Sequence, residues 1–259
     1  QACNPFFRHI HVEHPVAEQI YQILTGDEKK HVVLTGHAGD GKTTIALDVY
    51  KRLSGLPSDD ALVQPLQCRE NVGSVSLIKD FSERSSAMRA ALMGEMLDNK
   101  GPTFLLVSNT GTLLDTFRAE EQKRGGNWVG VESDLLSAMN AVEPTTVPFH
   151  GAEFVLLNVA MMDNLPIARE IFEKMLVLER WAPCHSGTCK DKCPIIRNVS
   201  LMQANFPVVR DRLFLAYRRI YEYGNRLTLR QLCAHMAYMI TSGLDYSDIL
   251  KMADRKSVV

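Results

Sequence analysis

The sequence predicts an α/β protein, with a parallel sheet covered by helices on both faces and followed by a helical C-terminal section. Three observations carry this prediction. A glycine-rich loop at residues 36–43 separates the apolar run Val32–Leu34 from a helical pattern. Short apolar runs then alternate with helical patterns up to about residue 160, as in parallel sheets. From Asn164 onward only helical periodicity remains.

Each expected strand is a short apolar run. The runs are His31–Thr35, Ala61–Leu66, Ser74–Lys79, Thr103–Ser108 and Glu153–Ala160. Together they predict a five-stranded parallel sheet, with helices between several of the strands. The stretch Gly125–Gly151 holds a Gly-Gly pair and two prolines, so we expect an exposed excursion around one helix, Glu132–Met139.

Helical periodicity marks Val16–Leu24 before the first strand and further segments after the last one. These are Asn164–Arg180, Arg210–Tyr223 and Thr228–Thr241, with a cysteine-bearing interruption at 183–194. We therefore expect two domains, residues 1–200 as an α/β domain with an N-terminal lead-in and residues 201–259 as a helical lid. Because the chain begins at Gln1 rather than at methionine, we expect a fragment of a longer protein.

The bulk composition excludes several classes of protein. Lysine and arginine number 29 against 30 acidic residues, so no overall basic field attracts nucleic acid, and we expect any DNA contact to be local or made through a partner. Apolar residues make up 46% of the chain, enough for a sizeable core. No apolar run approaches the roughly 18 residues of a membrane span, and the polar start is unlike a signal peptide. We expect a cytoplasmic protein without membrane contact.

Residues 36–43 read Gly-His-Ala-Gly-Asp-Gly-Lys-Thr, a complete P-loop between a strand and a helix. Glycines let the backbone curl until successive N–H groups point at the phosphates of a nucleotide, and the helix N-terminus adds a positive potential. Lys42 would reach the β- and γ-phosphates, and Thr43 a magnesium ion. The predicted phosphate-binding residues are Gly36, His37, Ala38, Gly39, Asp40, Gly41, Lys42, Thr43 and Thr44. The predicted ligands are ATP and Mg²⁺.

Two acidic residues follow the third expected strand. Asp80 ends it, where a P-loop protein needs an aspartate to hold magnesium through water. Glu83 lies one helical turn further, and its carboxylate could polarise the attacking water as a general base. The spacing departs from the adjacent Asp-Glu pair of many ATPases, so an ordinary acid at a helix N-terminus is an equal interpretation of Glu83. For Asp80 the alternative is a strand-end turn residue.

Two further polar side chains complete the expected site. Asn109 follows the fourth strand at the carboxyl edge of the sheet, where ligands of open α/β sheets bind, and could orient water at the γ-phosphate. It is also a good N-cap for the helix Thr112–Phe117. Arg230 stands in the first turn of a helix capped by Thr228, where the helix dipole disfavours a cation. An anionic partner and a solvated surface arginine explain Arg230 equally well.

These motifs together resemble those of AAA+ type ATPases. More narrowly, the segments Gly36–Thr44, Lys79–Glu83, Val107–Gly111 and Cys193–Ile195 are similar to the bacterial family of DNA phosphorothioation-dependent restriction proteins. The resemblance implies an ATPase of an anti-phage restriction system that acts with companion proteins. It assigns Lys42 and Thr43 to phosphate and magnesium, Asp80 and Glu83 to Walker B, Asn109 to sensor 1 and Arg230 to sensor 2. It also implies an arginine finger from a neighbouring subunit in a homo-oligomer, with Arg210 and Arg212 as candidates. The sequence does not choose between these two arginines, and the alternative for both is an ordinary surface charge.

Three classes of function are compatible with a phosphate loop. In a motor or switch ATPase, hydrolysis changes contacts between subunits or with DNA-bound partners. In a binding module, ATP is held and hydrolysed poorly while the helical section serves as a docking surface. A kinase would need an acceptor pocket and lid arginines, and Asn109 together with the helical C-terminus disfavours it. We expect hydrolysis of ATP to ADP and phosphate, with the binding module as the alternative.

Three of the six cysteines crowd together, at Cys184, Cys189 and Cys193. In a cytosolic protein such clustering favours a metal, and three thiolates with His185, Cys233 or His235 would suit tetrahedral zinc. The spacing matches no common zinc signature, so a reduced metal-free loop or a bond formed on oxidation is the alternative. The dispersed histidines at positions 9, 11, 14, 31 and 37 are expected to be ordinary surface residues.

Overall fold

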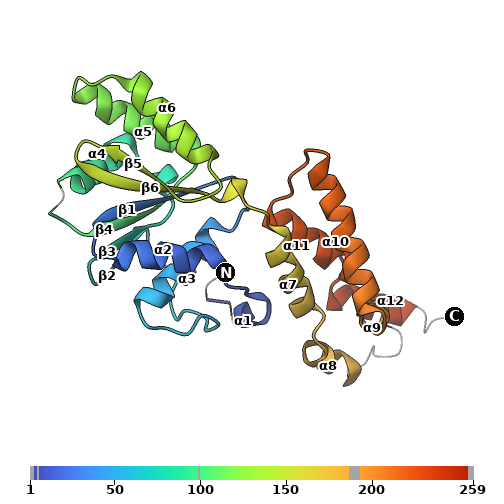
Figure 1. Ribbon diagram of the computed structural model, residues 1–259. Coiled ribbons are helices and arrows are strands. Elements are labelled where there is room, and N and C mark those ends of the chain that lie inside the picture. The colour runs from blue at the N-terminus through green and yellow to red at the C-terminus, as the bar shows by residue number, and fades with distance from the viewer. Residues whose placement is uncertain (1–2, 5, 99, 187–192, 256–259) are drawn as a thin grey trace. The chain divides into compact units, whose positions relative to one another are not determined.

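The computed structural model describes residues 3–4, 6–98, 100–186 and 193–255, which divide into two compact units between Asp163 and Asn164 (Figure 1). The sequence pattern had suggested a division near residue 200. Helices between residues 165 and 204 contact the later helices, and they therefore belong to the second unit. The aromatic ring of Phe172, for example, packs against those of Phe206 and Phe214.

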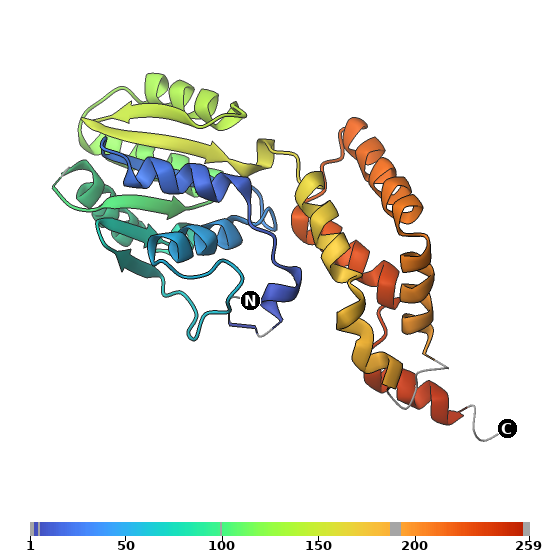
Figure 2. The same ribbon diagram turned by 60° about the horizontal axis from the view of Figure 1, so that its bottom comes forward.

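The first unit is built on a six-stranded mixed sheet with the strand order β2-β3-β4-β1-β6-β5. Its strands are β1 (Lys30–Thr35), β2 (Arg69–Val72), β3 (Val75–Ile78), β4 (Thr103–Val107), β5 (Thr145–Phe149) and β6 (Ala152–Asn158). The four central strands are parallel, while β2 and β5 run antiparallel at the two edges. In Figure 2 the arrows of β4 and β6 point the same way and that of β5 points the opposite way.

Helices cover both faces of this sheet (Figure 1). They are α2 (Pro15–Thr25), α3 (Lys42–Leu53), α4 (Ser86–Leu97), α5 (Thr110–Lys123) and α6 (Trp128–Asn140). The unit also contains the short helix α1 (Phe7–Ile10) and the 3₁₀ turns η1 (Phe81–Glu83) and η2 (Val159–Met161). Val33 and Leu106 point into a core shared with α4, α5 and α6. Leu34 and Leu105 point to the opposite face, into a core shared with α2 and α3. The central strands are apolar on both faces because both faces are covered.

Four of the predicted strands are confirmed, as β1, β3, β4 and β6. The strand predicted at Ala61–Leu66 is wrong, because this segment is an irregular loop in which Val63 is 97% exposed. The edge strands β2 and β5 were not predicted. Each is short and carries polar residues, and β5 contains Pro148, which has no N–H to donate to a ladder. The sheet therefore has four parallel strands and two antiparallel edges, not five parallel strands.

The stretch expected to be an exposed excursion contributes to the core. Leu135 on α6 and Phe149 on β5 are both buried against the sheet. β5 and β6 form a hairpin whose turn residues, His150 and Gly151, have φ of 47° and 84°. A two-residue turn of this kind twists with the flanking strands, so the stretch folds back onto the edge of the sheet.

The second unit consists of helices in its described part. They are α7 (Leu165–Met175), α8 (Leu178–Ser186), α9 (Pro194–Ala204), α10 (Phe206–Glu222), α11 (Leu229–Thr241) and α12 (Tyr246–Arg255). The single helix expected at Asn164–Arg180 is two helices, since α7 ends at Met175. The start of α11 is as predicted, with Thr228 and Gln231 forming a capping box. Over the ranges that the structure describes, no helix has both the length and the apolar character needed to cross a membrane.

Candidate functional site

The glycine-rich loop connects β1 to α3 through backbone conformations that glycine adopts most easily. Gly36, Gly39 and Gly41 have φ of 146°, 95° and 90°, and Gly41 is the N-cap of α3. A Cβ atom on Gly36 would lie 2.6 Å from Cγ2 of Val159. The motif's glycines are therefore required by the backbone and, at Gly36, by the close approach of the segment that follows β6.

Lys42 is the first residue of α3, and its side chain turns back across the loop. Its Nζ donates to the carbonyl oxygens of Gly36 and His37, both at 2.8 Å. The first turn of α3 contains no acidic residue, and its leading N–H groups have no acceptor within the helix. An ammonium group and helix N-terminal amides thus meet at one loop, which is the arrangement that binds anions. Thr43 is exposed beside them.

Asp40 holds the loop closed from within. Its side chain is buried, with only 1% of the residue exposed, and its Oδ2 accepts the N–H of His37 at 2.9 Å. The Asp40 N–H in turn lies 3.3 Å from the His37 carbonyl oxygen. The sequence placed Asp40 among the phosphate-binding residues, and in the structure its side chain binds the loop's own backbone. His37 itself is exposed.

The acid turn, residues 80–83, follows β3. Asp80 is in the left-handed region, with φ 53° and ψ 44°, a conformation that costs a non-glycine residue about 1 kcal/mol or more and that recurs at functional sites. Its Oδ2 lies 3.7 Å from Nζ of Lys79. Phe81 is completely buried, whereas Glu83 is exposed and donates its N–H to the Asp80 carbonyl at 3.0 Å. The turn therefore presents two carboxylates on either side of a buried anchor.

Asn109 is the N-cap of α5, so the capping interpretation is confirmed. Its Oδ1 accepts the N–H of Thr112 at 2.8 Å, and the residue is exposed. With Oδ1 used in this way, the side-chain NH₂ is the group that can donate to a ligand. Capping the helix and orienting a ligand are therefore compatible roles for one amide.

The loop, Asn109 and the acid turn lie at the same edge of the sheet. β4 lies between β1 and β3, with Leu34 opposite Val107 and Ile78 opposite Leu106. Adjacent strands are about 4.8 Å apart, so β1 and β3 are separated by about 10 Å. A contact between two hydroxyl groups joins the end of β1 to the start of α5, since Thr35 Oγ1 lies 3.1 Å from Oγ1 of Thr110.

The predicted arginines lie in the second unit. Arg230 is exposed in the first turn of α11. Arg210 forms ion pairs with Glu173 at 3.1 Å and with Asp211 at 3.0 Å, so it has a role within this unit. Arg212, the other arginine-finger candidate, is exposed.

The predicted zinc ligands fall partly outside the described residues, where Cys189 lies. Cys193 is buried in an apolar cluster of the second unit, and Cys184 packs against the same cluster. His235, one of the candidate fourth ligands, has its Nδ1 2.6 Å from the hydroxyl of Tyr217. In the part of the chain that the structure describes, no three His, Cys, Asp or Glu side chains gather closely enough to hold a metal. The zinc site remains a prediction.

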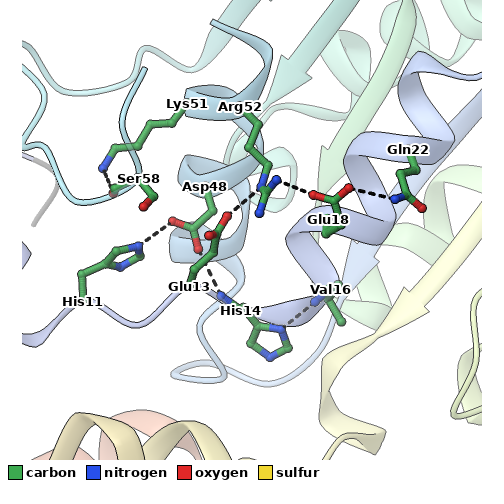
Figure 3. A network of polar contacts seen from close by, with 10 residues as sticks. All are labelled: His11, Glu13, His14, Val16, Glu18, Gln22, Asp48, Lys51, Arg52 and Ser58. Atoms are coloured by element: carbon green, nitrogen blue, oxygen red, sulfur yellow. Dashed lines mark hydrogen bonds and ion pairs between the residues drawn. The ribbon is translucent and has the colours of Figure 1, made fainter. Parts of the chain in front are cut away.

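A network of polar contacts joins α3 to the segment that precedes and begins α2 (Figure 3). Nε2 of His11 is 3.0 Å from Oδ1 of Asp48, and the N–H of His14 donates to Oδ2 at 3.4 Å. His14 Nδ1 accepts the N–H of Val16 and so caps α2. Burial raises the pKa of Asp48 and lowers that of His14 to about 4. Prediction of these two histidines as surface residues was wrong, since they are 5% and 7% exposed.

Two further residues of α3 bind the same segment. Arg52 Nε donates to Glu13 Oε1 at 2.6 Å, and its Nη1 pairs with Glu18. Lys51 is 1% exposed, donates from Nζ to the Ser58 carbonyl at 2.6 Å and lies 4.3 Å from the centre of the Phe7 ring. The helix that begins at the glycine-rich loop therefore also binds residues 7–18.

His31 is a third histidine wrongly expected at the surface, because it is 1% exposed. Its Nδ1 accepts the N–H of Phe104 at 3.1 Å, which leaves Nε2 to donate to the Met96 carbonyl, also at 3.1 Å. Burial lowers the pKa of His31 to about 4, so its ring is neutral at pH 7. Its place inside an apolar strand was the available signal in the sequence.

Comparisons with protein-family models, with curated proteins and with solved structures found no match for this chain. The functional assignment therefore depends on the residues at the carboxyl edge of the sheet. These are the glycine-rich loop, Asn109 and the acid turn.

Proposed function

We propose that the chain is a magnesium-dependent ATPase that hydrolyses ATP to ADP and phosphate. The observation that carries the proposal is the loop, in which three glycines with positive φ lead from a buried strand into α3. The Lys42 ammonium lies across the loop carbonyls of Gly36 and His37, close to where phosphates would bind. The four parallel strands with this loop after β1 also support an AAA+-like P-loop fold.

Each residue at the edge then has a chemical role. Lys42 would bind the β- and γ-phosphates, while the Thr43 hydroxyl and, through water, Asp80 would hold Mg²⁺. Bound there, Mg²⁺ would neutralise the charge that develops on the phosphate oxygens. Glu83 takes a proton from the attacking water, and the amide NH₂ of Asn109 orients that water. We assign Arg230 to the γ-phosphate as a lid residue, after the AAA+ resemblance.

The motifs also support a biological setting. Since they are similar to those of the restriction protein DptF, we propose a component of a bacterial DNA phosphorothioation-dependent restriction system. Hydrolysis would drive assembly with companion proteins in the cytoplasm or the restriction of unmarked DNA. The balanced charge of the chain supports indirect contact with DNA.

A second candidate function is an ATP-binding switch with little hydrolysis of its own. The acid turn favours it, because Glu83 is exposed and separated from Asp80 by two residues. A base in such a position could depend on a partner to orient it.

The experiment is an ATP binding and turnover assay on the full chain with Mg²⁺, at several protein concentrations. Lys42→Ala should abolish both readouts, whereas Lys100→Ala, at an exposed position before β4, should preserve them. Glu83→Gln should abolish turnover and preserve binding. Binding without turnover in the parent chain would favour the switch. Equal binding by the parent and Lys42→Ala would contradict both functions.

A further inference from the structure

The hydroxyl group of Ser82 joins the acid turn to the end of β4. The N–H of Asn109 donates to Ser82 Oγ at 2.8 Å, and this oxygen lies 3.2 Å from Oγ of Ser108. Ser108 Oγ donates its hydrogen to the Asn109 carbonyl at 3.0 Å. Because each hydroxyl has one hydrogen, the Ser82 hydroxyl must be the donor in the contact between the two serines. Ser82 Oγ therefore accepts one hydrogen bond and donates another.

This pair of hydrogen bonds holds a segment whose carboxylates project toward solvent. The Asp80 side chain is 38% exposed and Glu83 is exposed. Between them, Phe81 anchors the turn by complete burial in the core shared with α4, α5 and α6. Ser82 is the second anchor, and it fastens the turn sideways to the neighbouring strand end.

The strand end that receives Ser82 is itself fixed. Ser108 is 2% exposed, and its N–H donates to the Leu34 carbonyl of β1 at 3.1 Å. Asn109 starts α5 as its N-cap. The bond between Ser82 Oγ and the Asn109 N–H thus sets how far the carboxylates of the acid turn lie from the asparagine and, through β1, from the phosphate loop.

We propose that Ser82 is a positioning residue of the proposed ATP hydrolysis, which holds Asp80 and Glu83 in register with Asn109. The inference rests on the proposed function. Ser82 touches no phosphate in this role, and it acts through the acid turn. A shift of about 1 Å between reacting groups lowers rates up to a hundredfold, so removal of the hydroxyl should lower kcat by about tenfold or more. Affinity for nucleotide should change little, because the loop belongs to β1 and α3.

The test compares three variants of the full chain. Ser82→Ala removes both hydrogen bonds, and Ser82→Thr keeps the hydroxyl. Ser85→Ala is the matched control, because the Ser85 hydroxyl is three residues away and caps α4 by accepting the N–H of Met88. Turnover gives kcat, and calorimetric titration with a non-hydrolysable ATP analogue and Mg²⁺ gives affinity.

We expect Ser82→Ala to lower kcat about tenfold or more with affinity within twofold, Ser82→Thr to restore kcat to within about threefold, and Ser85→Ala to change neither. Amide hydrogen exchange supplies a readout independent of turnover. The Asn109 N–H should exchange at least about tenfold faster in Ser82→Ala than in the parent or in Ser85→Ala.

Two results would overturn the positioning role while leaving the ATPase intact: an unchanged kcat in Ser82→Ala, or equal losses in Ser82→Ala and Ser85→Ala. A parent chain that neither binds nor hydrolyses ATP would overturn the proposed function and this role together. Unchanged exchange at Asn109 in Ser82→Ala would remove the hydrogen bond on which the inference depends.

Discussion

The buried imidazole of His31 makes the first unit sensitive to acid. In the folded chain burial lowers the pKa of His31 from 6.5 to about 4, while in the unfolded chain the ordinary value applies. Between these pH values the unfolded state binds a proton that the folded state rejects. His31 therefore makes its full contribution to stability above pH 6.5. Below that value the free energy of unfolding falls by about 1.4 kcal/mol per pH unit.

The magnitude follows from the two pKa values. At pH 4.5 the free energy of unfolding is lower by about 2 to 3 kcal/mol because of His31 alone. Solvent screens this effect little, because the residue is 1% exposed. His14, with its pKa also lowered to about 4, adds a loss of the same sign. Asp48 acts in the opposite direction. Burial raises its pKa, so the folded state binds its proton more tightly than the unfolded state, and acid stabilises the fold at this residue.

The assay is urea unfolding between pH 7.5 and 4.5, followed by tryptophan fluorescence. The chain has two tryptophans, so Trp181→Phe leaves Trp128 as the sole reporter of the first unit. In this background, the free energy of unfolding of His31→Gln should fall by about 2 to 3 kcal/mol less than that of the parent between pH 7.5 and 4.5. His37→Gln, at an exposed histidine, should follow the parent. Identical pH dependence in the parent and in His31→Gln would refute the reasoning.

Two further predictions concern the loop and the cysteines. Gly36→Ala should lower the free energy of unfolding by about 2 to 4 kcal/mol, because its Cβ would meet Val159 Cγ2 at 2.6 Å and its φ is 146°. Gly55→Ala, with φ 66° and open space, is the control and should lose about 1 kcal/mol in the same urea titration. If the 184–193 segment binds zinc, the purified chain should contain about one zinc per molecule by elemental analysis, and serine at the cysteines of that segment should remove it. Zinc-free chain with full stability would contradict the site.

The central strands could be predicted because each is buried on both faces and therefore reads as an apolar run. The edge strands β2 and β5 carry no such run, because some of their side chains face solvent. The hairpin of β5 and β6 did have a local signal, the turn pair His150-Gly151 directly after β5. Pro148 hid this signal, because a proline argues against a strand.

The candidate site divides in the same way. The glycine-rich loop, Asp80 and Asn109 come just after the ends of β1, β3 and β4. The parallel order of these strands brings them to one edge of the sheet, and this could be expected from the sequence. The contacts of Ser82 and of His11 could not, because their partners lie 27 and 37 residues away with no repeating pattern between them. Such contacts depend on tertiary packing rather than on local sequence.

The contacts between α3 and the N-terminal segment decide where a shortened version of this protein can begin. A chain starting at residue 15 would deprive the Asp48 carboxylate of both His11 and the His14 N–H, and Arg52 of Glu13. Leaving a buried polar group without its hydrogen-bond partners costs about 1 to 3 kcal/mol, a sizeable part of a domain's total stability. Truncation for crystallisation or for binding assays should therefore stop before Phe7, and limited proteolysis should spare residues 7–18 while the helix behind them stays folded.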